Sequence, residues 1–215
     1  MEGQRVPRSR SGPSAILSAR RGWGYSNTDY NLLGLVIEHA TGKPWRAALR
    51  ERIIDRLGLK HTSLPEPGHN SIRSDAAHGY ELVNGKLRDV TDVDPSMADA
   101  AGGDALVATT ADLAHFLNAL LAGQLFEHAK TLNEMLTFVD AKGAPGLVGY
   151  GLGVERYELP GGVEVIGHAG GTAGYLTFVG HLPAQDIDVA MVINNRDDPT
   201  PVLIPALKLI VAQVS

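Results

Sequence analysis

Two stretches near the start of the ordered sequence repeat apolar residues at helical spacing. The first runs over residues 27–41, where Asn27 opens the pattern with a helix-start residue and Gly42 follows it as a stop signal. The second runs over residues 44–57 and ends at Gly58. The sequence therefore predicts two consecutive helices here, each with one apolar face.

Two further helices are predicted from spaced start signals. Thr109 and Asp112 lie three residues apart ahead of an apolar periodic stretch that ends at Gly123. Thr131 and Glu134 repeat the same spacing, and an apolar face continues behind them to residue 139. We expect both pairs to act as capping boxes.

After residue 145 the apolar period changes from helical to two, which favours strands. Short turns between these stretches predict an antiparallel meander of about four strands. A last apolar stretch, residues 201–214, returns to helical spacing and is expected to pack on a face of the sheet. The expected strands cover residues 150–154, 163–167, 175–182 and 187–194.

These elements predict an α/β (α+β) fold in which an antiparallel β-sheet is packed by the C-terminal helix and joined to a helical subdomain. We place the domain at residues 23–215, with the helical part at about 23–145 and the sheet with the C-terminal helix at about 146–215. A short hairpin is expected around Asn84-Gly85, because Asn-Gly is the strongest two-residue turn signal. Residues 1–22 are rich in arginine, serine, proline and glycine, and are expected to form a disordered leader.

Composition narrows the classes of function. The chain of 215 residues has a formal net charge of -5 and no basic stripe interleaved with aromatic residues, so we expect no nucleic-acid partner. It has no cysteine, which excludes thiol nucleophiles and cysteine-ligated metals but leaves the compartment open. We find no apolar core of a signal peptide and no run long enough to span a membrane. The histidines show no metal-ligand spacing, and no phosphate loop or dinucleotide fingerprint is present, so we expect no metal and no cofactor.

Candidate chemistry lies in two short motifs. Tyr25-Ser26-Asn27 stands at a predicted helix entrance, where the plain interpretation is a capped turn. His168 stands among four glycines between two strand-like runs, where the plain interpretation is a glycine-rich turn. Ser26 imitates a nucleophile elbow but lacks its last glycine and its leading strand, so we do not expect it to be a nucleophile.

The order and surroundings of the two motifs resemble the serine hydrolases that group class C β-lactamases, D-alanyl-D-alanine carboxypeptidases and related esterases. In that family a Tyr-x-Asn element precedes a helix and a Lys/His-x-Gly element lies on an edge strand. The resemblance extends from about residue 22 to the C-terminus. It rests on Y-S-N-T-D-Y-N-L-L-G-L-V-I-E-H-A-T-G-K-P-W, on A-A-G-G-D-A-L-V-A-T-T-A-D-L-A-H-F, on Y-G-L-G-V and on H-A-G-G-T-A-G-Y.

The resemblance implies a role for each matching residue. Tyr25 would exchange a proton during acylation and deacylation, and Asn27 would hydrogen-bond the substrate. A phenol with a pKa near 10 needs neighbouring positive charge to act at neutral pH, and His168 would supply or tune it. Gly170 and Gly171 would bring the strand backbone against the scissile carbonyl, with the Gly171 N–H as an oxyanion donor.

Two departures from the family pattern shape the functional hypothesis. Ala169 stands where the β-lactamase and peptidase branches commonly carry threonine, which favours the esterase branch. No lysine has a serine three residues before it, so the sequence holds no Ser-x-x-Lys nucleophile motif.

The sequence therefore predicts a β-lactamase-related serine hydrolase of esterase, β-lactamase or D-Ala-D-Ala carboxypeptidase type, acting through an acyl-enzyme on a small-molecule ester, amide or β-lactam. We expect the chain alone to be inactive. One alternative is a non-catalytic ligand- or partner-binding module with the same fold. Another is complementation, in which an N-terminal segment on a separate polypeptide supplies the serine helix.

Overall fold

The computed structural model describes residues 22–65, 76–92, 106–195 and 200–214. The leader predicted over residues 1–22 lies almost wholly outside these ranges. The helices are α1 (Asn27–Thr41), α2 (Trp45–Leu49) with its π-helical continuation η1 (Arg50–Asp55), α3 (Thr110–Leu121), α4 (Ala129–Met135) and α5 (Thr200–Val214). The strands are β1 (Tyr80–Val83), β2 (Lys86–Asp89), β3 (Val139–Asp140), β4 (Leu147–Tyr150), β5 (Glu155–Leu159), β6 (Val163–Thr172), β7 (Tyr175–Leu182) and β8 (Ile187–Ile193).

The main sheet has six strands in sequence order, β3-β4-β5-β6-β7-β8, and every neighbouring pair is antiparallel. The predicted meander is thus confirmed, but with six strands rather than four. β6 is the longest strand and continues through the glycine-rich segment to Thr172.

The strand expected over residues 150–154 is wrong. Gly151 to Val154 form the turn between β4 and β5, closed by a Gly151 N–H to Val154 carbonyl hydrogen bond of 2.7 Å. Gly153 has a φ of 76°, a conformation outside the strand region. Leu152 is 68% exposed, so the apolar alternation of this stretch does not mark a buried face.

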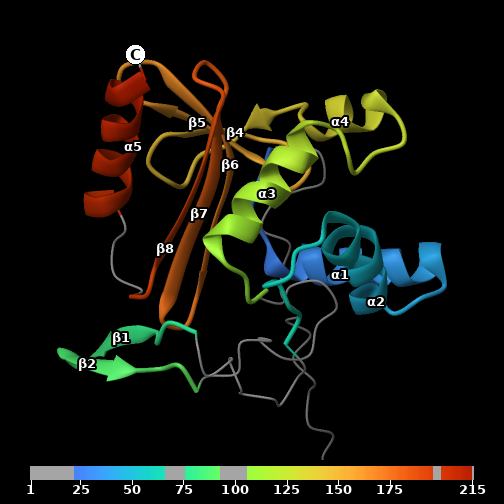
Figure 1. Cartoon of the computed structure of the whole chain (residues 1–215), viewed down its shortest axis with the longest axis horizontal. Coiled ribbons are helices and arrows are strands. Elements are labelled where there is room, and N and C mark those ends of the chain that lie inside the picture. Colours follow the sequence, from blue (N-terminus) through green and yellow to red (C-terminus); the bar gives the residue numbers. More distant parts are fainter. Residues whose placement is uncertain (1–21, 66–75, 93–105, 196–199, 215) are drawn as a thin grey trace, which may run out of the picture.

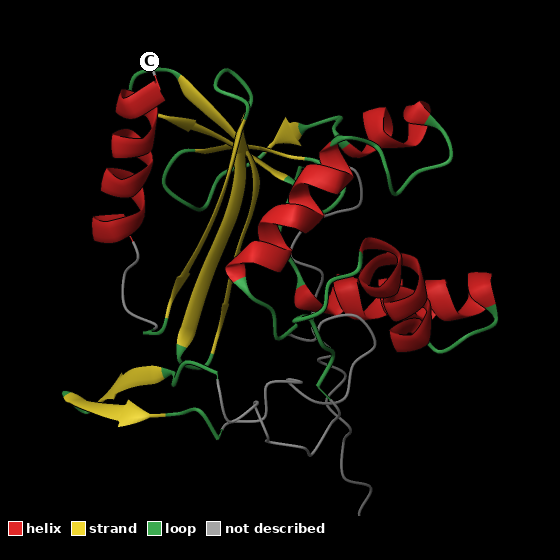
Figure 2. Cartoon of the chain, viewed as in Figure 1, coloured by secondary structure: helices red, strands yellow, loops and turns green. Residues whose placement is uncertain are grey.

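Two helices cover opposite faces of the sheet (Figure 1, with helices and strands distinguished in Figure 2). On one face α5 packs into the main core, where Leu207 lies against sheet residues that include Val165 and Phe178. On the other face α3 lies over β7 and β8, and Asn118 of α3 donates a hydrogen bond of 2.8 Å to Asp188 of β8. The predicted C-terminal helix and its packing on the sheet are confirmed.

The helical part forms around a second, smaller core. Its buried residues are Trp45, Ile54, Leu59 and Leu64. Helix α1 begins and ends where the sequence predicts, but only Gly34 of this helix is buried. Five large apolar residues of α1 are exposed: Leu32, Leu33, Leu35, Val36 and Ile37.

The two predicted capping boxes have different outcomes. The Thr109 hydroxyl accepts from the Asp112 N–H at 3.2 Å, so the N-cap of α3 is confirmed. Asp112 does not return the bond, because its carboxylate accepts from the backbone N–H of His61 and the hydroxyl of Thr62, both at 2.8 Å. The second box is wrong: α4 begins at Ala129, two residues before Thr131, and ends at Met135.

The predicted Asn84-Gly85 hairpin is formed by β1 and β2. Asn84 and Gly85 have φ values of 54° and 73°, as a two-residue type I′ turn requires. Within the described ranges no helix is long and apolar enough to cross a membrane.

Candidate active site at the entrance of α1 and the middle of β6

Tyr25 is held at the entrance of α1 by the helix cap that follows it. The Ser26 side chain accepts a hydrogen bond from the Asp29 N–H at 3.4 Å, and its extended backbone turns the chain into the helix. The Ser26 hydroxyl therefore serves as the N-cap of α1. Tyr25 remains 48% exposed, so its phenol can meet a ligand.

His168 lies in the middle of β6, partly buried, and the next three residues along the strand are exposed. These residues are Ala169, Gly170 and Gly171. An exposed stretch of backbone with almost no side chains can approach a flat substrate group closely. The geometry is therefore suited to the contact expected of Gly170 and Gly171.

The fold brings Tyr25 and His168 together across 143 positions of sequence. Their ring centroids lie 6.4 Å apart, at an interplanar angle of 51°. Asn27 is the first residue of α1 and is exposed, two residues beyond Tyr25. The structure thus brings Tyr25 and His168 together, and Asn27 follows Tyr25 in the first turn of α1.

Two tyrosines that the sequence reasoning missed complete this cluster. Tyr150, at the end of β4, has its hydroxyl 3.1 Å from His168 Nε2, and also hydrogen-bonds the hydroxyl of Tyr30 in α1. The ring centroid of Tyr25 lies 5.5 Å from that of Tyr30 and 6.5 Å from that of Tyr150. Trp23 packs on the other side, with its centroid 4.9 Å from Tyr150. The site is therefore a cluster of aromatic rings around one histidine.

Glu155 is a third residue that the sequence reasoning missed, and it is the buried carboxylate of the site. It is 8% exposed and accepts hydrogen bonds from the Tyr157 hydroxyl at 2.5 Å and the Ala169 N–H at 2.8 Å. Its Oε2 lies 4.0 Å from His168 Nδ1. Tyr157 and Leu159 point to the same face as Glu155 at a period of two, and this alternation was the signal that could have placed Glu155 inside.

The electrostatics around Tyr25 oppose the expected activation. Burial raises the pKa of the Tyr25 phenol, and the neighbouring Tyr30 and the negative charge of Glu155 raise it further. Burial and the hydrogen bond with Tyr30 also raise the pKa of Tyr150. Both phenols are therefore protonated at neutral pH, and a nearby positive charge would be needed to turn Tyr25 into a base.

Glycine is required for different physical reasons at different positions of β6. A Cβ on Gly167 would lie 2.0 Å from the Val179 carbonyl oxygen of β7, so this position is closed by the protein itself. A Cβ on Gly170 would meet only the Thr177 hydroxyl, at 3.2 Å. The backbone of β7 thus accounts for Gly167, whereas the predicted substrate contact concerns Gly170 and Gly171.

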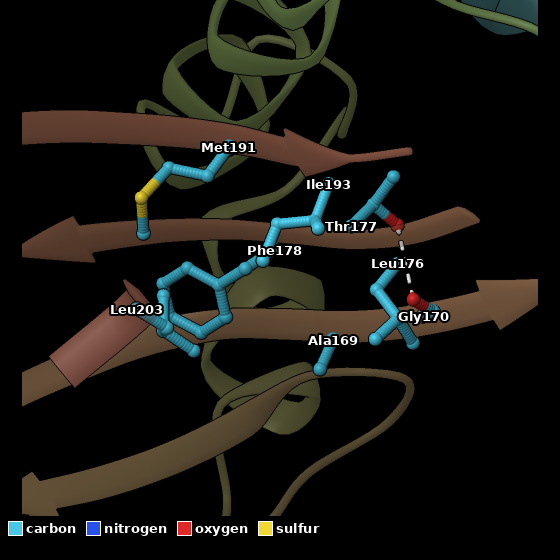
Figure 3. Close-up of a pocket in the computed structure, with 8 residues that line it drawn as sticks. All are labelled: Ala169, Gly170, Leu176, Thr177, Phe178, Met191, Ile193 and Leu203. Carbon is cyan, nitrogen blue, oxygen red and sulfur yellow. Dashed lines mark hydrogen bonds between the residues drawn. The ribbon is translucent and has the colours of Figure 1, made fainter. Parts of the chain in front are cut away.

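A cavity of about 240 Å³ lies beside the same strand, but on its other face. Its wall is almost entirely apolar and includes Ala169, Phe178, Ile193 and Leu203, as Figure 3 shows. Because side chains alternate along a strand, the Ala169 methyl points to the face opposite His168. This cavity is therefore separate from the aromatic cluster.

Metal ligation finds no support in the described ranges. No group of three histidine, aspartate or glutamate side chains lies close enough there to hold an ion. The chemistry that the arrangement offers is that of phenols, an imidazole, a buried carboxylate and an open glycine backbone.

An α/β fold with a tyrosine at a helix entrance facing a His-x-Gly strand defines the class of the β-lactamase and transpeptidase folds. The sequence profile described as Beta-lactamase matches residues 12–212, and the chain belongs to this family of serine hydrolases. The match covers both predicted motifs and all described helices and strands up to residue 212.

Relatives with known names share this membership. The D-alanyl-D-alanine-carboxypeptidase/endopeptidase AmpH of Escherichia coli K12 is 23% identical over 183 residues, which cover 79% of this chain and 44% of that protein. Among solved structures, a D-stereospecific amidohydrolase from Streptomyces sp. is 34% identical with a TM-score of 0.73, covering 81% of this chain and 51% of that one. The D-amino acid amidase from Ochrobactrum anthropi SV3, complexed with L-phenylalanine amide, is 31% identical with a TM-score of 0.76, covering 90% and 59%. The chain thus spans about half the length of the relatives it matches.

Proposed function

We propose that this chain forms the tyrosine and His-x-Gly walls of an acyl-transfer site for ester, amide or β-lactam substrates, and that it does not turn over substrate alone. The observation that carries the proposal is the 6.4 Å approach of the Tyr25 and His168 rings beside the exposed Gly170-Gly171 backbone. The absence of Ser-x-x-Lys from the sequence supports the second half. In this site Tyr25 exchanges a proton, Asn27 bonds the substrate, and the backbone of Gly170 and Gly171 meets the carbonyl.

Amides and peptides of D-amino acids are the first substrates to test. Three relatives carry names that specify D-alanyl-D-alanine, a D-stereospecific amidohydrolase and a D-amino acid amidase. Ala169 stands where the β-lactamase and peptidase branches of the family commonly carry threonine, so a neutral substrate is favoured over a carboxylate. D-phenylalanine amide and its ester therefore stand ahead of penicillins.

The serine nucleophile would come from a complementing N-terminal segment. The exposed apolar residues of α1 and the cavity beside α5 both support such a partner, because burying several hundred Å² of apolar surface stabilises by on the order of several kcal/mol. Strand β8 lies at the edge of the main sheet. In the described ranges it pairs along its length only with β7, so its other edge presents backbone N–H and C=O groups that could bind a strand of the partner segment.

The test is acylation by a fluorophosphonate probe, with adducts mapped by mass spectrometry. The chain alone is expected to give no labelled serine. Addition of an N-terminal segment that carries the Ser-x-x-Lys motif of the family is expected to give a label on the added serine. Tyr25→Phe and His168→Ala are each expected to slow that labelling by about 100-fold or more.

Tyr175→Phe and His39→Ala are the matched controls, since they remove the same groups outside the aromatic cluster. Labelling of a serine in the chain alone contradicts the predicted inactivity. Unchanged rates in both site variants contradict the roles of Tyr25 and His168.

A non-catalytic binding module is the second candidate, and the raised pKa of Tyr25 favours it, since a protonated phenol donates hydrogen bonds rather than accepting protons. Calorimetric titration of the chain with D-phenylalanine amide separates the two. Saturable binding that Tyr25→Phe weakens, with no label after adding the serine segment, supports the binding module.

A further inference from the structure

A chain of hydrogen bonds crosses three elements at the aromatic cluster. The hydroxyl of Tyr30 in α1 bonds the hydroxyl of Tyr150 at the end of β4. The Tyr150 hydroxyl lies 3.1 Å from Nε2 of His168 in β6. On the other side of the ring, His168 Nδ1 lies 2.5 Å from the carbonyl oxygen of Ala169. The imidazole is therefore held at both nitrogens.

The chemistry of the partners fixes the direction of each bond. A carbonyl oxygen only accepts, so Nδ1 of His168 must carry a proton and donate to Ala169. In the neutral imidazole Nε2 is then the acceptor, and the Tyr150 hydroxyl must donate to it. The Tyr150 oxygen is left to accept from the Tyr30 hydroxyl. All three bonds consequently point the same way, from Tyr30 to Ala169.

We propose that Tyr150 is a positioning residue that acts with the Ala169 carbonyl to hold His168 as the Nδ1–H tautomer, and that Tyr30 in turn donates to Tyr150. The proposal takes its catalytic meaning from the proposed function of His168. Its structural content stands without that function, because the hydrogen bonds are present in the chain itself.

Glu155 braces the same strand from the other side. Its carboxylate accepts from the Ala169 N–H, while the Ala169 carbonyl accepts from His168. Ala169 is thus held at both of its backbone groups, immediately before the exposed Gly170. The network therefore sets the orientation of the strand backbone as well as that of the ring.

Protonation of His168 reverses the chain. A proton that arrives at Nε2 makes this nitrogen a donor, so the Tyr150 oxygen must accept from it. The Tyr150 hydroxyl then turns to donate to Tyr30, and the Tyr30 hydroxyl turns outward. Formation of the imidazolium is thus coupled to the rotation of two phenol O–H bonds.

The test is long-range ¹H–¹⁵N NMR of His168 in the 215-residue chain, which reports which ring nitrogen carries the proton. In the unsubstituted chain at high pH we expect Nδ1 to show the shift of a protonated nitrogen and Nε2 that of an unprotonated one. Tyr150→Phe is expected to weaken this preference, so that the Nε2–H tautomer becomes detectable, because only the Ala169 carbonyl then selects the tautomer. A neutral ring that carries its proton on Nε2 in the unsubstituted chain overturns the proposal without recourse to any variant.

Tyr157→Phe is the matched control, because it removes a buried hydroxyl that bonds Glu155 and leaves Nε2 untouched. It is expected to keep the Nδ1–H signature, and loss of the signature in this control as well as in Tyr150→Phe would assign it to general disruption of the site. An unchanged tautomer in Tyr150→Phe overturns the proposal. The NMR experiment could confirm the tautomer while the complemented chain still shows no acyl transfer. That result would refute the proposed function but not the positioning role of Tyr150.

Discussion

Gly167 offers the sharpest test of how tightly β6 is built against β7. Gly167 pairs with Gly180, and a Cβ on Gly167 would lie 2.0 Å from the Val179 carbonyl oxygen and 2.7 Å from Gly180 Cα. Both neighbours are backbone atoms of a central strand, so the clash can be relieved only by moving the strands apart. Overpacking of this kind costs typically about 1 to 3 kcal/mol, and we expect Gly167→Ala to lie at the upper end.

The control is Gly170→Ala, three residues further along the same strand. There the nearest atom to a new Cβ is the Thr177 hydroxyl at 3.2 Å, at an exposed position. We expect this substitution to change the free energy of unfolding by less than about 0.5 kcal/mol.

Urea unfolding followed by circular dichroism measures the difference. With a slope of about 2 kcal/mol per M, a loss of about 3 kcal/mol lowers the midpoint by roughly 1.5 M for Gly167→Ala. Equal midpoints for the two variants would refute the reasoning, because they would mean that β6 can shift at no cost.

The remaining predictions concern α5 and the hairpin. Leu207→Ala, at a position 1% exposed in the main core, is expected to lower the free energy of unfolding by about 2 to 5 kcal/mol, whereas Leu209→Ala, 66% exposed on the same helix, is expected to change it by less than about 0.5 kcal/mol. Equal effects in the two variants would contradict the packing of α5. Hydrogen bonds from Thr91 lower the pKa of Asp89 to about 2, so the stabilisation by this carboxylate is complete above its unfolded pKa and is lost as the pH falls through about 2. NMR titration of the Asp89 side chain is expected to show this midpoint, and Thr91→Val is expected to raise it; a normal midpoint in the unsubstituted chain would exclude the hydrogen bonds.

Short sequence patterns correctly predicted those elements that depend only on neighbouring residues. The Asn84-Gly85 turn, the cap at Thr109 and the helical spacing of residues 201–214 each depend on a few neighbouring positions, and all three are formed. The alternation over residues 150–154 misled, because Gly151 and Gly153 impose a turn that apolar spacing does not reveal. Residue propensity and the spacing of apolar residues predict single helices and strands well. They do not reveal where glycine interrupts a strand with a turn.

Only some residues of the aromatic cluster could be predicted from the sequence. Tyr25 and His168 stand out because they lie in recognisable motifs. Tyr30 lies 120 positions from Tyr150, and nothing in the local sequence of either residue announces their contact. From its residue type alone, Glu155 would be placed on the surface, and only the burial pattern of β5 shows that its side chain points inward. Side chains that act through tertiary contacts alone are the part of the site that local patterns cannot supply.

The β1–β2 hairpin is fastened to parts of the chain that are synthesised much later. The Tyr175 hydroxyl donates to the Ala77 carbonyl across 98 positions, and the Asn194 side chain donates to the His78 carbonyl across 116. Closing a loop of about 100 residues costs roughly 4 kcal/mol in chain entropy, and ribosomes need on the order of 5 to 20 s to make that length. The hairpin therefore leaves the ribosome long before Tyr175 and Asn194 have been made. The two contacts that fasten the hairpin therefore cannot form until the main sheet itself has been made.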